Sequence, residues 1–347
     1  MLDAVCAATG TPRSFFEVDP DDLPADTLAF RKTASSSVTE VERVSATVRE
    51  AYGVSARLLT EVGMRRAVLP RAEGDLDGDD IERLAEETRD ALGIARDSVM
   101  QHLTRTCERA GIPVVPMMLL DRGGNAEDRV IGHFGASCWR GTEDPSLISY
   151  FSASSGDRQR FTIAHELGHL VLHPARRHIS PKLAEQEAHR FAGALLVPRE
   201  RAYEALEAPF QLRELGELKA RWGVSMQALI MRSRHLEIID KERTQSLFKQ
   251  IANRGWRLNE PVIVHPEQPL LMRTMMTRRF GKSGASSRQA SEELGLNLVL
   301  LRSLVPEVGA ASSVATAQAP RADVVNLASR RRQVPDIEIA DRKSDWG

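Results

Sequence analysis

The sequence lacks the features of membrane-spanning and secreted proteins. No apolar run approaches the about 20 residues that a membrane-spanning helix needs. The amino-terminal segment MLDAVCAATGTPRSFF has neither the basic start nor the continuous apolar stretch of a signal peptide. The three cysteines, Cys6, Cys107 and Cys138, are an odd number without a CxxC pair, which favours reduced thiols over a disulfide framework. We therefore expect a cytoplasmic protein with no membrane partner.

The sequence also lacks an excess of either charge. Its 47 Lys and Arg residues balance 48 Asp and Glu residues, which gives a formal net charge of −1. The chain as a whole therefore has no electrostatic attraction to nucleic acid, and any DNA binding requires a local basic patch. Hydrophobic residues make up 42% of the 347 positions, enough for a folded protein that buries a core.

The clearest chemical signal is HELGH at residues 165–169, inside a run that is apolar wherever it is not part of the motif. The pattern predicts a helix from Asp157 to His173. Residues four apart project from one face of a helix, so His165 and His169 can bind one Zn²⁺ while Glu166 acts as the catalytic base. A catalytic zinc site has three protein ligands and an open fourth position. The motif therefore needs one more ligand.

A second helix, predicted from Ala184 to Leu196, offers that ligand. Glu185 begins a stripe of small and apolar residues, whereas Glu187 points from another face of the same helix. We predict Glu185 as the third ligand, with Glu187 as the alternative. His189 lies one turn after Glu185, where it can orient a ligand from outside the coordination sphere.

Four further side chains are candidates for assisting the reaction. His173 lies four residues after His169 and could be a fourth ligand or a donor to the transition state; we favour a third interpretation, that it ends the helix and faces solvent or the rim of the cleft. Tyr150, His178 and Arg158 are candidates for stabilising the oxyanion, a role that sequence spacing does not assign.

The segments RQRFTIAHELGHLVLH (158–173) and EQEAHRFAGALLVP (185–198) together resemble the core pattern of the ImmA/IrrE family of HExxH metallopeptidases. The similarity extends from about residue 79 to about residue 261. It implies an α/β (α+β) fold, with a zincin-like core in which a short sheet lies beside the HExxH helix, flanked by mainly helical amino- and carboxy-terminal regions. It also implies zinc ligands at His165, His169 and Glu185 and a base at Glu166. His189 is a departure, because family members often carry Asn or Asp there.

The resemblance implies a zinc-dependent endopeptidase that regulates transcription in a stress response. Its substrate would be a partner protein, a DNA-binding helix-turn-helix repressor or an antitoxin, whose cleavage relieves repression. The alternative is a transcriptional regulator that uses the zincin core as a sensor or protein-binding module with little turnover. Glu166 favours the peptidase, because a purely structural zinc site needs closed coordination and no base.

The pattern of helices, strands and linkers predicts six regions. Residues 1–37 are similar to the end of a Cro/C1-type (XRE) helix-turn-helix module with its linker, and 38–75 form a helical connector. The peptidase core occupies 76–205, a helical hairpin 206–260, a carboxy-terminal helical module 261–306 and a disordered tail 307–347.

Two of these regions contain candidates for DNA binding. Residues 212–235 have the outline of a helix-turn-helix, but acidic residues alternate with basic ones, which favours a structural hairpin that covers the core. Residues 273–302 contain six basic and two acidic residues. This basic region could bind DNA or another protein, and a DNA partner is not favoured for the chain as a whole.

Overall fold

A computed structural model describes residues 1–17, 28–30, 38–117, 119–120, 126–127, 135–141, 144–151, 155–176, 178–207, 210–284 and 287–305. These residues all belong to one unit, Met1–Ala310. The second unit, Ala311–Gly347, lies outside the described residues, and so does the predicted tail at 307–347. Most of the predicted linker, at 18–27 and 31–37, is outside them as well.

The chain combines helices with short strands, so the predicted mixture of α and β structure is confirmed. The helices are α1 (Leu2–Thr9), the 3-10 helix η1 (Arg13–Phe16), α2 (Val38–Val62), α3 (Gly78–Ala91), α4 (Leu103–Arg109), α5 (Gly156–Leu172), α6 (Pro181–Leu196), α7 (Arg199–Ala205), α8 (Leu212–Trp222), α9 (Met226–His235), α10 (Lys241–Asn253), α11 (Leu271–Phe280), α12 (Arg288–Leu294) and α13 (Leu298–Leu304). The strands are β1 (Leu28–Phe30), β2 (Val114–Met117), β3 (Leu119–Leu120), β4 (Ala126–Glu127), β5 (Gly135–Trp139) and β6 (Ser146–Phe151).

The main sheet has the strand order β1-β5-β6-β2. β5 is antiparallel to both of its neighbours, whereas β2 and β6 run parallel. Ser137 on β5 stands opposite Ile148 on β6 and opposite Ala29 on β1. Strands β3 and β4 form a separate antiparallel pair.

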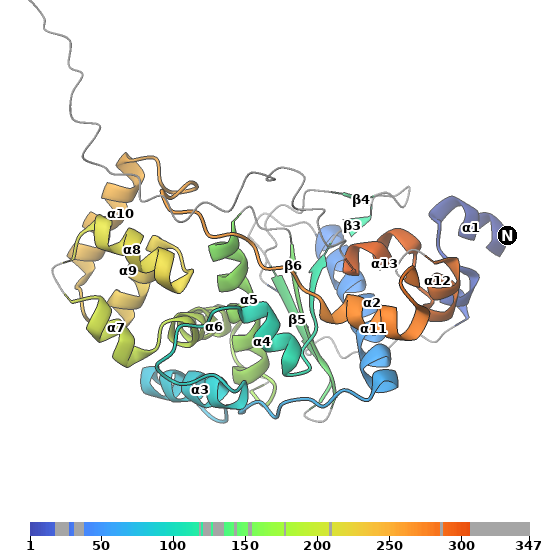
Figure 1. The fold of residues 1–347 in the computed structure, drawn as a ribbon, viewed down its shortest axis with the longest axis horizontal. Helices are drawn as coiled ribbons and strands as arrows, with labels where there is room; N and C mark the ends of the chain where they lie inside the picture. Colours follow the sequence, from blue (N-terminus) through green and yellow to red (C-terminus); the bar gives the residue numbers. More distant parts are fainter. Residues whose placement is uncertain are drawn as a thin grey trace, which may run out of the picture. The chain divides into compact units, whose positions relative to one another are not determined.

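Successive residues of a strand point to opposite faces of the sheet, and here each face has its own core. Trp139 and Ile148 belong to the core on the side of α5. Their neighbours Cys138 and Leu147 belong to the core on the side of α2 and α11. Figure 1 shows the resulting layers, with α5 and α6 on one side of β5 and β6 and with α2, α11 and α13 on the other.

The second core joins segments that we predicted as separate regions. Val48 and Leu58 of α2 are fully buried there together with Met275 of α11 and Leu301 of α13. Gly53 does not interrupt α2, which runs unbroken from residue 38 to residue 62. The predicted connector and the predicted carboxy-terminal module thus cover one face of the sheet together, and their division into independent domains remains a prediction.

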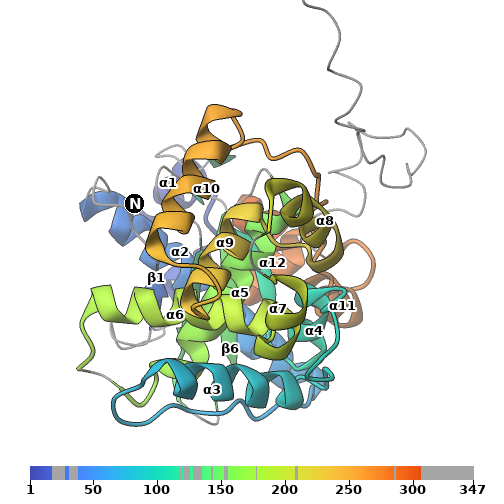
Figure 2. The same cartoon turned by 90° about the vertical axis from the view of Figure 1, so that its left-hand side faces the viewer.

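Helices α5 and α6 lie close together, and α3 lies next to α6 (Figure 2). The start of α6 is fixed by Ser180, whose Oγ accepts a hydrogen bond from the Leu183 N–H, and by proline in the first turn. A Cβ on Gly168 would lie 3.0 Å from Phe191 Cδ1 and 3.3 Å from Ala188 Cα. The glycine within HELGH therefore lets α6 approach α5 closely enough to bring α6 side chains to the histidines.

The structure also bears on the sequence prediction about membranes. Within the described residues, none of the helices combines the length and apolar composition that crossing a bilayer requires.

Candidate metal centre

The motif residues lie buried in the middle of α5. The exposed fractions are 2% for His165, 0% for Glu166 and 3% for His169. The Nε2 atoms of the two histidines are 3.1 Å apart. The two imidazoles therefore present their Nε2 atoms to the same point, as expected for residues four apart on a helix.

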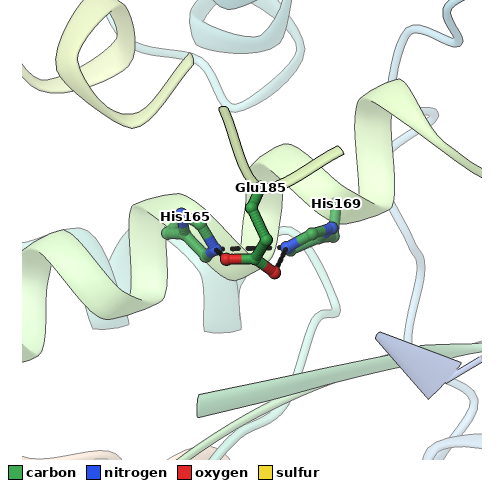
Figure 3. Close-up of side chains that lie close together, drawn as sticks. All are labelled: His165, His169 and Glu185. Carbon is green, nitrogen blue, oxygen red and sulfur yellow. Dashed lines mark hydrogen bonds and ion pairs between the residues drawn. The ribbon is translucent and has the colours of Figure 1, made fainter. Parts of the chain in front are cut away.

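Glu185 on α6 lies across the two imidazoles (Figure 3). Its Oε2 is 3.4 Å from His165 Nε2, and its Oε1 is 3.4 Å from His169 Nε2. Among the described residues, these three side chains form the one cluster of His, Cys, Asp and Glu donors that lie within 4.8 Å of one another. The alternative ligand, Glu187, contacts His173 and Arg176 instead.

The spacing of the three donors fits a zinc ion. Zn–N and Zn–O bonds are about 2.0–2.2 Å long, so ligand atoms at two corners of a tetrahedron are about 3.3–3.6 Å apart. The separations of the three donor atoms, 3.1, 3.4 and 3.4 Å, are close to this ligand-to-ligand distance. Three protein ligands leave one position for water or substrate, which is the arrangement of catalytic zinc sites.

The protonation states of the donors suit a divalent metal. Burial lowers the pKa of His165 to about 4, so the imidazole is neutral near pH 7 and its lone pair is available. Burial acts to raise the pKa of Glu185, but hydrogen bonds with His165 and His169 outweigh it and hold that pKa well below its usual range. The site therefore offers the neutral imidazole of His165 and the anionic carboxylate of Glu185, two kinds of donor that zinc accepts.

A series of buried polar side chains contacts His169 on Nδ1, the ring nitrogen that does not face His165 and Glu185. Its Nδ1 is 2.9 Å from Nδ1 of His173, and Nε2 of His173 is 3.2 Å from Oε2 of Glu187. Arg176 donates to both oxygens of Glu187, at 2.6 and 3.0 Å. His173 is only 7% exposed. His173 does end α5, as its C-cap residue, but our expectation that it faces solvent is wrong, because its contacts with Glu187 and His169 hold the side chain inside the protein.

The catalytic base proposed from the motif, Glu166, faces strand β5. Ser137 Oγ donates to Glu166 Oε2 at 2.9 Å, and both residues are fully buried. A Cβ on Gly135 would lie 2.6 Å from Thr162 Cγ2 and 2.8 Å from Glu166 Oε1, so a larger residue there would displace one of these side chains. Sequence reasoning missed Ser137. The alternation of β5 residues places it on the α5 face, but only the pairing of the sheet shows that it meets Glu166.

The other candidates lie around the three donors or away from them. His189 packs edge-on against His165, with ring centroids 5.4 Å apart, so a supporting role stays a prediction. Tyr150 is buried beside Gln159, and burial raises its pKa to about 12. Arg158, at the start of α5, donates to the backbone carbonyl of Arg257 at 3.4 Å, and His178 is exposed.

The predicted hairpin at 212–235 packs against the peptidase core. Leu229 and Ile230 of α9 are buried, and α9 contacts α6. Arg232 is 1% exposed; it forms an ion pair with Glu82 on α3 and donates to the carbonyl of Val197 at 2.9 Å. The inner face of α9 is therefore used to cover α3 and α6, as in the structural interpretation that we favoured.

A sheet beside an HExxH helix, with a glutamate supplied by the next helix, defines a metallopeptidase core of the zincin type. Residues 107–234 match the model of the Peptidase_M78 family, described as the IrrE N-terminal-like domain. The ImmA/IrrE resemblance of the sequence is thereby confirmed. The match indicates a metallopeptidase and leaves the predicted XRE module outside its bounds. No curated protein matches the chain as a relative.

Proposed function

We propose that this protein is a zinc-dependent endopeptidase whose metal is held by His165, His169 and Glu185. The observation that carries the proposal is the convergence of these three donors, at separations of 3.1 to 3.4 Å, beside a buried glutamate. A zinc ion bound there supplies a Lewis acid, which polarises a carbonyl and makes water acidic enough to lose a proton near pH 7.

The protein's own residues supply the proton transfers. Glu166 accepts the proton of the attacking water on its carboxylate and passes it to the amine of the leaving peptide. Ser137 holds the carboxylate in place through its bond to Oε2. Because Glu166 is buried and borders β5, the proton moves in a site shielded from bulk water.

For the substrate we propose a DNA-binding helix-turn-helix repressor or antitoxin whose cleavage relieves repression. The support for this partner is the resemblance to the ImmA/IrrE family. The proposed biological role, regulation of transcription in a stress response, has the same support.

Replacement of Glu166 tests the proposal, because Glu166→Gln keeps the size of the side chain and removes the proton acceptor. We expect the variant to stay folded, to retain about one zinc per chain and to lose peptide cleavage by several orders of magnitude. His165→Ala, in contrast, should lose the metal. If Glu166→Gln keeps zinc and relieves repression in cells as well as the unmodified protein does, the peptidase proposal fails. The zincin core would then act as a sensor or binding module.

A further inference from the structure

Strand β5 forms one wall of the proposed catalytic site. Ser137 Oγ donates to Glu166 Oε2 at 2.9 Å, and Gly135 passes so close to Glu166 that a Cβ there would lie 2.8 Å from Oε1. One edge of β5 is paired with β6. The other edge is the place where an extended peptide could pair with the strand that borders the base.

The chain's own residues 28–30 occupy that edge. Strand β1 runs antiparallel to β5, with Leu28 opposite Cys138, Ala29 opposite Ser137 and Phe30 opposite Ala136. The residue opposite Ala29 is therefore the one that contacts the catalytic base. β1 also approaches α5. In Figure 3 it is the blue arrow on the sheet side of α5, next to the green strands.

The edge of a strand can pair with only one other strand at a time. An exposed edge binds an extended peptide through main-chain hydrogen bonds, which depend little on the peptide's side chains. Such pairing suits an endopeptidase, because it holds the peptide extended beside the catalytic groups. Residues 28–30 make the same kind of pairing from within the chain.

We propose that residues 28–30 are an internal occupant of the peptide-binding edge of β5, and that they must leave it before a substrate can be cleaved. This inference rests on the peptidase function proposed above and adds a regulatory step to it. A pairing of three residues is short enough to open reversibly, so a substrate that pairs over a longer stretch can displace it.

The register offers a direct way to lock the occupant in place. Directly opposite residues of an antiparallel pair have Cα atoms about 4.5–5.5 Å apart, within the range that a disulfide spans. Leu28→Cys should therefore form a disulfide with the native Cys138, whose thiol is reduced in the unmodified protein. Phe30→Cys is the matched control, because it stands opposite Ala136 and has no thiol to join.

Two measurements on the full chain test the inference. The first uses Leu28→Cys combined with Glu166→Gln, and it follows binding of a labelled peptide copying residues 24–34 by fluorescence anisotropy. This binding does not require catalysis. The second uses Leu28→Cys with Glu166 intact and follows cleavage of an internally quenched peptide. Both compare the oxidised protein with protein reduced by a phosphine, since dithiols bind zinc.

We expect oxidation to weaken peptide binding at least tenfold and to abolish cleavage, and reduction to restore both. The Phe30→Cys control should respond to neither treatment. If the reduced protein binds the labelled peptide but does not cleave the quenched peptide, the proposed peptidase function is wrong. The inference that residues 28–30 occupy the peptide-binding edge is then still supported. Failure of the disulfide to form, equal peptide binding in both redox states, or no binding in either state overturns the inference.

Discussion

His169 and His173, one turn apart at the end of α5, face each other through their Nδ1 atoms at 2.9 Å. One nitrogen must donate and the other accept. Nε2 of His169 faces the other two donors, so binding a metal there requires the proton of His169 on Nδ1. His173 then accepts on Nδ1 and donates from Nε2 to Glu187. The contact thus selects the tautomer of His169 that can bind a metal.

The first prediction follows from this contact. His173→Ala removes the acceptor for His169 Nδ1–H, so the protein should bind zinc about 10–100-fold more weakly while keeping its fold. Competition with a chelator of known affinity measures the change. His178→Ala is the control, because His178 is an exposed histidine a few residues away. Unchanged zinc affinity in His173→Ala would show that His169 needs no partner on Nδ1.

The second prediction separates a ligand from a residue that acts through another. Glu185→Gln removes the anionic donor and should weaken zinc binding by about tenfold or more, both in the unmodified protein and in His173→Ala. Glu187→Gln acts through His173, so it should weaken binding in the unmodified protein and add nothing in His173→Ala. Thermal unfolding of each variant controls for the loss of the Arg176 ion pair. An equal effect of Glu187→Gln in both backgrounds contradicts the indirect role.

Features of local origin could be predicted from the sequence. Helix α1 ends at Thr9, where the glycine at position 10 indicates a stop, because Gly10 adopts φ 64°, a conformation that glycine accepts without strain. The convergence of His165 and His169 follows from helical periodicity alone. The face of a second helix was enough to predict which carboxylate lies near the histidines, since Glu185 does so and Glu187 contacts His173 instead.

Features that depend on distant partners could not be predicted. The sequence from Asp97 to about Ala110 suits a helix throughout, but α4 begins at Leu103. Its first N–H groups are bound by the carboxylate of Glu267, 164 residues away in the sequence for Leu103. β1 lies in a stretch rich in Pro, Asp and Ser that we interpreted as a linker, and only its pairing with β5 makes it a strand. The burial of His173 likewise depends on a partner on α6, Glu187, that the sequence around His173 does not reveal.

The third prediction concerns Ser137. Ser137→Ala removes the hydroxyl that holds Glu166 Oε2, so kcat for an internally quenched peptide should fall about tenfold, with little change in KM or in zinc content. Ser149→Ala is a matched control. Ser149 is an equally buried serine on the adjacent strand, and its hydroxyl donates to the Ala136 carbonyl instead. An equal loss of kcat in both variants would indicate a general effect on the sheet.

The last prediction concerns stability and pH. Glu267 is 7% exposed, accepts hydrogen bonds from the backbone N–H groups of Leu103 and Thr104, and forms an ion pair with Arg160 on α5. Burial acts to raise its pKa, but the hydrogen bond with His102 and the charge of Arg160 outweigh it and lower the pKa from 4.5 to about 2. Glu267, which precedes α11, therefore connects its own segment to the start of α4 by hydrogen bonds and to α5 by an ion pair.

A carboxyl whose pKa is lower in the folded protein stabilises the fold above its unfolded pKa. Its contribution is fully present above pH 4.5 and is lost as the pH falls from about 4.5 towards 2. The shift corresponds to about 3 kcal/mol of unfolding free energy at neutral pH. Glu267→Gln should therefore lower the melting temperature markedly at pH 7 and by much less at pH 3. Glu217→Gln, an exposed residue paired with Arg213, should change it little at either pH. A Glu267→Gln effect of the same size at both values would show that its charge does not stabilise the fold.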